Sequence, residues 1–266
     1  MAEFMSLSSG SCGNCYYFGN GTDGVLIDAG VSLKSLRRVM QEKGISLDSV
    51  GAVLVTHDHL DHIRHLGSFC RKLMKPVHAP ARLHEALAVH TFTSGCIASY
   101  RKVLEEGQEN YAGGVKVRHF AVPHDTAVCY GYSLEIDGKK LVIMTDLGRM
   151  TDEAAAFASG ADAVVIESNY DMDMLMSGPY PYDLKMRICG GRGHLSNDDC
   201  AGAVRRFAHE GLKSVFLCHL SEHNNTPERA YACTRGALET ACRGNGMQMP
   251  ELHCLPRRHE SALFKL

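Results

Sequence analysis

The sequence lacks the features that mark several common classes of protein. Its 28 basic and 30 acidic residues give a formal net charge of −2 over 266 residues. A general basic surface for nucleic acid is therefore absent, and any contact with phosphate must be local. The chain has no low-complexity tract and no apolar stretch of membrane-spanning length. Residues 1–13 lack a basic start followed by a long apolar run, so we expect no secretory signal peptide and no membrane association.

Cysteine is plentiful but is not arranged as in a zinc ribbon or a disulfide-rich domain. The 11 cysteines are scattered, and without an export signal they favour reduced thiols and a cytoplasmic location. Cys12 and Cys15 form a CxxC motif, but no second pair stands at a similar spacing, as a structural zinc site would require. A redox motif would open a helix, whereas residues 16–21 are typical of a strand and a turn. We therefore expect a plain turn with buried thiols.

Short apolar runs and amphipathic helical patterns follow one another along the whole chain. Residues 137–140 (DGKK) favour a hairpin between two strands. Early strands adjoin one another and later strands alternate with helices, which predicts an α/β (α+β) protein with sheets inside, helices outside and a single domain over 1–266. Capping residues and periodicity predict helices at 32–44, at 196–211 and from 226 onward. Strands are expected at 4–9, 15–19, 24–30, 52–56, 115–122, 129–136, 140–146, 162–167, 215–220 and 261–266.

Four metal-binding side chains are crowded into the segment THDHLDH at residues 56–62. Imidazole suits zinc, iron, manganese or nickel, and carboxylate adds a hard ligand. His57 and His59 are two residues apart, so both project to one side of an extended turn, and Asp58 points away from them. Because four such ligands cannot reach one ion comfortably, we predict two adjacent divalent metal ions here. The alternative is a polar loop with several surface histidines.

The HxHxDH motif after an apolar strand resembles the metallo-β-lactamase superfamily, whose fold is an αββα sandwich with metals at one edge of two mixed sheets. Further candidate ligands follow strand patterns in the order of that superfamily, although each alone could be a turn, cap or core residue, and His119 is a rival to His124. The lactam-hydrolysing members place Cys in the second metal site, where this chain has Asp and His. The resemblance therefore implies the phosphodiesterase and nuclease branches. It also implies a first metal held by His57, His59 and His124, a second held by Asp61, His62 and His219, and Asp146 as a bridge.

Four segments that span most of the chain, 6–18, 164–171, 180–197 and 220–228, resemble the YycJ (WalJ) family. This resemblance implies a cytoplasmic metal-dependent nuclease with 5′→3′ exonuclease activity on DNA. The sequence departs from the family at His65, where the family usually has glycine, and in the larger number of cysteines near its start. His65 would either crowd the start of a helix or add a group beside the site.

The expected chemistry is hydrolysis of a phosphodiester by two metal ions that share and activate a water molecule, and zinc, manganese and iron all fit the ligands. Asp61, Asp146 and His194 are the expected catalytic residues, with His194 assisting the leaving oxygen. The segment 8–14 either offers backbone N–H groups to a phosphate or forms a tight turn. Lys185, Arg187 and Arg192 either supply local positive charge for a polynucleotide backbone or form a solvated face. His194 is a candidate substrate contact because it lies near a helix start at Ser196 that favours anions. The other candidate contacts are Ser196, Asn197, His223 and Arg192.

Two other functions fit the same ligands. The first alternative is a metal-dependent hydrolase of a small ester, thioester or cyclic phosphodiester. The second is a metal-binding regulatory module without enzymatic activity, which the complete ligand set disfavours. The methionine-rich segment 171–193 shows little periodicity before residue 184, so we expect a loop packed over the core.

Overall fold

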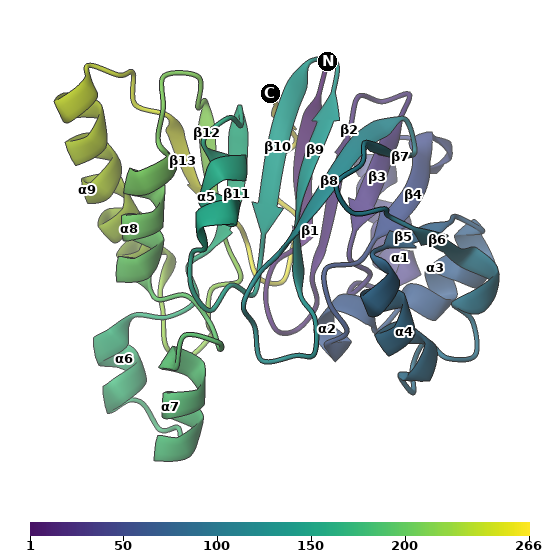
Figure 1. The fold of residues 1–266 in the computed structure, drawn as a ribbon, viewed down its shortest axis with the longest axis horizontal. Coiled ribbons are helices and arrows are strands. Elements are labelled where there is room, and N and C mark those ends of the chain that lie inside the picture. The colour runs from purple at the N-terminus through teal and green to yellow at the C-terminus, as the bar shows by residue number, and fades with distance from the viewer.

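The computed structural model describes residues 1–266, except the side chain of residue 245. Two seven-stranded sheets lie face to face at its centre (Figure 1). The first sheet has the order β14 (Phe264–Lys265), β1 (Glu3–Ser8), β2 (Cys15–Gly19), β3 (Gly24–Ile27), β4 (Val50–Leu54), β5 (Val77–Ala79) and β6 (Arg101–Val103). The second sheet has the order β13 (Glu251–Cys254), β12 (Ser214–Cys218), β11 (Ala163–Glu167), β10 (Lys139–Met144), β9 (Tyr130–Ile136), β8 (Val115–Ala121) and β7 (Asn110–Ala112).

Helices cover the outer face of each sheet, so the layers follow the αββα order that was expected. The first sheet is covered by α1 (Leu33–Glu42), α3 (Leu66–Leu73) and α4 (Ala81–Val89). The second is covered by α5 (Asp152–Ala158), α8 (Asn197–Phe207) and α9 (Pro227–Asn245). The short α2 (Leu60–Ile63) and the pair α6 (Met172–Ser177) and α7 (Tyr182–Cys189) lie beyond one end of the sheets, and both chain termini lie at the other end (Figure 1).

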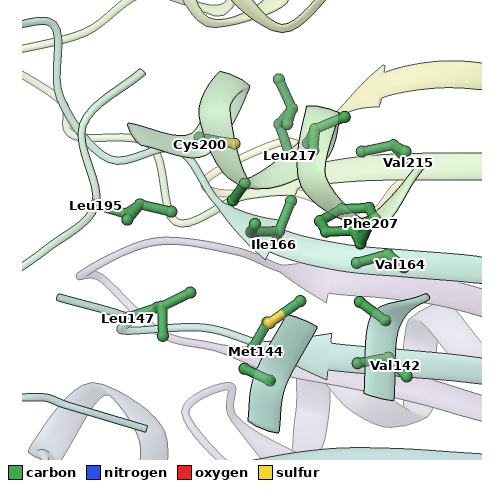
Figure 2. Close-up of a cluster of buried hydrophobic side chains, with 14 of the residues drawn as sticks. Val142, Met144, Leu147, Val164, Ile166, Leu195, Cys200, Phe207, Val215 and Leu217 are labelled. Carbon is green, nitrogen blue, oxygen red and sulfur yellow. The ribbon is translucent and has the colours of Figure 1, made fainter. Parts of the chain in front are cut away.

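Alternation along the strands builds three apolar cores. On β11, Ala163 and Val165 point into the core between the sheets, while Val164 and Ile166 face the helices and pack with Phe207 (Figure 2). A third core lies between the first sheet and its helices. The period of two in side-chain direction allows a continuous apolar run to serve two cores at once.

The structure confirms the predicted strands and helices within a few residues, but it adds elements that the sequence patterns did not reveal. The hairpin at 137–140 is confirmed, because β9 and β10 pair antiparallel around Asp137 and Gly138, both with positive φ. The short strands β5, β6, β7 and β13 were not predicted. The expectation of a loop at 171–193 was wrong, since α6 and α7 form there and leave methionines exposed.

The expectation for the CxxC motif is corrected in part. Cys15 is buried as predicted, but Cys12 is exposed, so only one thiol of the motif is covered. His119, the rival to His124, is half-buried against Tyr130 and belongs to none of the possible metal-binding groups of the described residues. No helix within the described residues is long and apolar enough to span a membrane.

Candidate metal centre

The predicted ligands lie where several strands end at one edge of the two sheets. His57 follows β4, and Asp146 and His219 follow β10 and β12. Since β10, β11 and β12 are parallel, their carboxyl ends meet at this edge. Asp28, Asp146 and His219 adopt left-handed φ values of 63°, 53° and 53°. Residues other than glycine rarely take this conformation, and here it turns each side chain into the site.

The structure brings all seven predicted ligands together. In each of three groups, the potential ligand atoms lie within 4.8 Å of one another: His57, His59 and His124; Asp61, His62 and His219; His57, His62 and Asp146. The first two are the groups that the resemblance implied for two separate ions. We call them the first and the second ligand group. The arrangement of nitrogen and oxygen donors, without cysteine, is suited to a divalent metal.

Asp146 occupies the position between the two groups. Its Oδ2 lies 3.1 Å from Nε2 of His62, and its Oδ1 lies 3.6 Å from Nε2 of His124. Oδ1 also lies 3.4 Å from Nδ1 of His219. One carboxylate therefore faces ligands of both groups, as a bridging residue would.

Hydrogen bonds fix the orientation of the imidazole rings. Nδ1 of His62 lies 2.7 Å from Oδ2 of Asp28, and Nδ1 of His219 lies 3.0 Å from Oε1 of Glu167. Nδ1 of His124 donates to the carbonyl oxygen of Gly193 over 2.7 Å. When Nδ1 carries the proton, Nε2 is left as the lone-pair donor, which is the usual arrangement for a metal-binding histidine.

Two buried nitrogen atoms show that the site is built for a further partner. Nε2 of His57 and Nε2 of His219 are buried and form no hydrogen bond within the described part of the chain. A buried polar atom without a partner costs free energy, and a metal ion in each ligand group would satisfy the atom that belongs to that group. The donors present therefore fit divalent metal ions.

Burial and neighbouring charges shift the pKa values of the buried histidines and carboxylates of the site, often in opposite directions. Burial lowers the pKa of His57 well below its usual value, and the nearby His62 lowers it further. Burial also disfavours protonation of His62, but the carboxylates of Asp28 and Asp146 outweigh it and raise the pKa of His62 well above its usual value. Burial would raise the pKa of Asp146, yet the neighbouring histidines, His219 first, hold it well below its usual value. The site thus keeps its carboxylates ionised and available to cations.

Two buried carboxylates were missed by the sequence interpretation. Glu167, at the end of β11, accepts from Nδ1 of His194 at 2.7 Å and from the backbone N–H groups of Leu147 and Leu195. Asp28, after β3, accepts from Thr56 and faces His62. Both follow apolar strand runs, as Asp146 does. An acidic residue at the end of a buried strand was the signal that could have identified them.

The predicted substrate contacts lie at different places relative to the metal centre. His194 lies beside the metal centre and, with His59, His219, Tyr180 and Arg187, lines a cavity of about 320 Å³ that we call the active-site cavity. Arg192 and His223 are exposed, and the ring of His223 lies 6.2 Å from that of Tyr180.

Ser196 and Asn197, also predicted to contact substrate, do not line this cavity. Ser196 caps α8 by accepting from the N–H of Asp199. Asn197 bonds with Ser168 and Asn225. Both residues are buried, so they hold the loop before α8 in place.

Asp125 and Asp58 lie around the first ligand group. Oδ1 of Asp125 is 3.2 Å from Nε2 of His124, and its other oxygen accepts from Arg187 of α7 at 2.6 Å. Asp58 accepts from the hydroxyl of Thr126 at 2.5 Å. Asp125 therefore ties α7 to the metal centre, and Asp58 braces the adjoining loop.

Comparison with known proteins agrees with this geometry. The β-lactamase superfamily domain matches residues 24–220. The chain belongs to this superfamily. Among solved structures with a similar fold is zinc-bound PqqB from Methylobacterium extorquens, with a TM-score of 0.72, 16% identity and coverage of 99% of this chain and 100% of that one. The metallo-β-lactamase fold protein YhfI from Bacillus subtilis has a TM-score of 0.68 and 15% identity, with 98% and 99% covered.

Closer relatives within the superfamily are similar in sequence over most of their length. The chain is 33% identical to exodeoxyribonuclease WalJ of Streptococcus pneumoniae serotype 2 over 245 residues, which cover 92% of this chain and 91% of that protein. It is 35% identical to exodeoxyribonuclease YycJ of Bacillus anthracis over 238 residues, or 89% of each. The chain therefore belongs to the WalJ/YycJ family, as its motifs indicated.

Proposed function

We propose that this protein is a metal-dependent exodeoxyribonuclease that hydrolyses phosphodiester bonds of DNA in the 5′→3′ direction. The observation that carries the proposal is the pair of ligand groups joined by Asp146, in a chain that is 33–35% identical to proteins named exodeoxyribonucleases. The 5′→3′ polarity rests on the family resemblance alone.

We propose two divalent ions, of zinc, manganese or iron. His57, His59 and His124 would hold one, Asp61, His62 and His219 the other, and Asp146 both. When bound, such ions lower the pKa of water and neutralise charge on a phosphate. The protein supplies a stiff edge of strands that fixes the donors, together with carboxylates that set the direction of the rings.

His194 is proposed to protonate the leaving oxygen. Its Nδ1 donates to Glu167 over 2.7 Å, which leaves Nε2 as the atom that exchanges a proton with substrate. Glu167 is fully buried and receives two backbone N–H bonds, so it is held rigidly and orients the ring of His194. A positioned acid of this kind contributes about 10²–10⁴-fold to a rate.

The active-site cavity is proposed to take the nucleotide that is released. Its volume of about 320 Å³ is in the range of cavities that bind small molecules. Arg187 projects from α7 into its wall, and Arg192 and His223 are proposed to contact phosphate from its surroundings.

The test uses metal-loaded protein with end-labelled duplex DNA, RNA and a chromogenic phosphodiester. We expect progressive shortening of the DNA with release of mononucleotides that carry a 5′-phosphate. Turnover of the small ester with both polymers intact would refute the proposal and support the small-ester hydrolase. If none of these substrates is hydrolysed, the result would support a metal-binding regulatory module without enzymatic activity.

We also propose that residues 1–266 form one domain that works in the cytoplasm. The core between the sheets draws side chains from both halves of the chain, so neither half buries its apolar face without the other. All 11 cysteines are free, which suits a reducing compartment.

A further inference from the structure

A second cavity, of about 330 Å³, adjoins the active-site cavity across residues 11–13. Ser11 lines the active-site cavity, and the next two residues, Cys12 and Gly13, line the second one. Its other walls include the first half of α1, the two residues that follow α2 and the segment 258–260. We call it the basic cavity, because its walls carry Arg38, Arg64, Arg258, His65 and His259.

The lining of the basic cavity carries more basic than acidic side chains. Its lining holds three arginines and one carboxylate, that of Glu260. Arg38 pairs with Glu42 and Glu260, and Arg258 pairs with Glu222. Arg64 forms no ion pair with any described residue, and its guanidinium reaches only the carbonyl oxygen of Cys12 at 3.5 Å. A cation without a carboxylate partner beside a cavity is free to bind an anion.

The backbone around the basic cavity adds to this preference. The helix α1 is capped by Ser32, has no acidic residue in its first turn and presents Ser32 and Ser35 to the cavity. The amino terminus of a helix carries partial positive charge and unpaired N–H groups. Gly13 keeps this wall tight, since a Cβ there would lie 2.6 Å from the carbonyl oxygen of Gly30.

The basic cavity is coupled to the metal centre by neighbouring residues. Arg64 follows the proposed ligand His62 by two positions in the chain. Asn14, next to Gly13, donates to Oδ2 of Asp61 at 3.1 Å. A long anion bound at the metal centre can therefore extend along the surface into the adjoining basic cavity.

We infer that the basic cavity binds a phosphate group of the DNA strand other than the phosphate that is hydrolysed. This inference rests on the proposed function. It gives a role to His65, which lines the cavity, and to the glycine-rich loop 8–14. The occupant is either the terminal phosphate of the strand or an internal one, which share the same chemistry.

The test compares Arg64→Ala and Arg258→Ala with Arg37→Ala, an exposed arginine of α1 that does not line the cavity. Steady-state kinetics are measured on single-stranded DNA and on bis(p-nitrophenyl) phosphate, with binding of a phosphorothioate oligonucleotide followed by anisotropy. Arg64→Ala is expected to raise KM and Kd for DNA about tenfold, with a smaller change for the short diester. It should also reduce the salt dependence of DNA binding by about one phosphate contact. Arg37→Ala should match the wild type.

Several outcomes separate this inference from the proposed function. Wild-type protein that neither degrades nor binds DNA would overturn the function, whereas DNA turnover with Arg64→Ala and Arg258→Ala both equal to Arg37→Ala would overturn the inference alone. Metal content is measured for each variant, and Arg64→Lys should restore part of the binding. If the Arg64→Ala variant loses metal, the inference is judged on the DNA binding of the Arg258→Ala variant, because Arg258 is remote from the proposed ligands in sequence. A 5′-hydroxyl substrate that reproduces the Arg64→Ala defect would identify the terminal phosphate; an equal defect on 5′-phosphate and 5′-hydroxyl substrates would identify an internal one.

Discussion

The two ligand groups differ in what supports them. In the second group, the rings of His62 and His219 are buried and each faces a carboxylate, Asp28 or Glu167. In the first group, His124 donates to a backbone carbonyl and the side chain of His59 is 35% exposed. A carboxylate behind an imidazole makes it a stronger ligand. Both groups reach the active-site cavity, through His59 and His219. We therefore expect the second group to hold a metal ion more tightly than the more exposed first group.

The largest effect is expected from removing the residue that both groups share. Asp146→Ala should lower turnover at least about a thousandfold and reduce the metal content of both positions. His57→Ala, which removes a ligand of the first group, should also abolish turnover but retain more metal. Metal analysis and rates on DNA provide the measurement, with the exposed Glu210→Gln as control. Unchanged rates and stoichiometry in Asp146→Ala would remove this residue from the site.

The second largest effect on turnover is expected from His194, which lies beside both ligand groups and is not proposed as a metal ligand. His194→Ala should reduce turnover by about 10²–10⁴-fold, because the leaving oxygen loses its proton donor, while metal stays bound. Glu167→Gln should reduce turnover less and also weaken the second position, since Glu167 faces His219 as well. Loss of metal from His194→Ala would instead place His194 among the ligands.

The difference between the groups is tested directly by Asp28→Asn. The substitution keeps the shape of the side chain but removes the charge behind His62, so metal affinity at the second position should fall about 10–100-fold. The first position should change less. Stepwise removal of metal by a chelator of graded strength would show which step shifts, and an equal shift in both would contradict the comparison.

The smallest effect is expected at His78 and concerns the pH dependence of folding stability. Burial, helped by His84 and Lys102, lowers the pKa of His78 to about 4. The unfolded chain binds this proton near its usual pKa, about 6.5, so the folded state loses stability as the pH falls from 6.5 towards 4. His78→Gln should reduce that loss by about 1 kcal/mol, a value discounted for the partial exposure of the ring. Urea unfolding at pH 7 and pH 5 provides the measurement; parallel losses in both proteins would contradict it.

Most of the fold was predicted from patterns among residues that are close together in the sequence. The strands of both sheets were identified because alternation and apolar runs are properties of neighbouring residues. Three-residue strands such as β5 and β6 are too short to show a period, and they form because the growing sheet supplies partners for their backbone groups. The helices α6 and α7 were missed because they lie outside the layered core, as Figure 1 shows, and so carry little amphipathic pattern.

The sequence by itself determined the HxHxDH motif after β4 and, through family order, the distant proposed ligands His124, Asp146 and His219. Only the tertiary structure decided which groups stand behind them. Asp28 and Glu167 act on His62 and His219 across 34 and 52 residues of chain, and Ser196 was shown to be a buried cap. The physical reason is that a ligand's type is a local property, whereas burial and hydrogen-bond partners depend on which strand ends meet at one edge of the sheets.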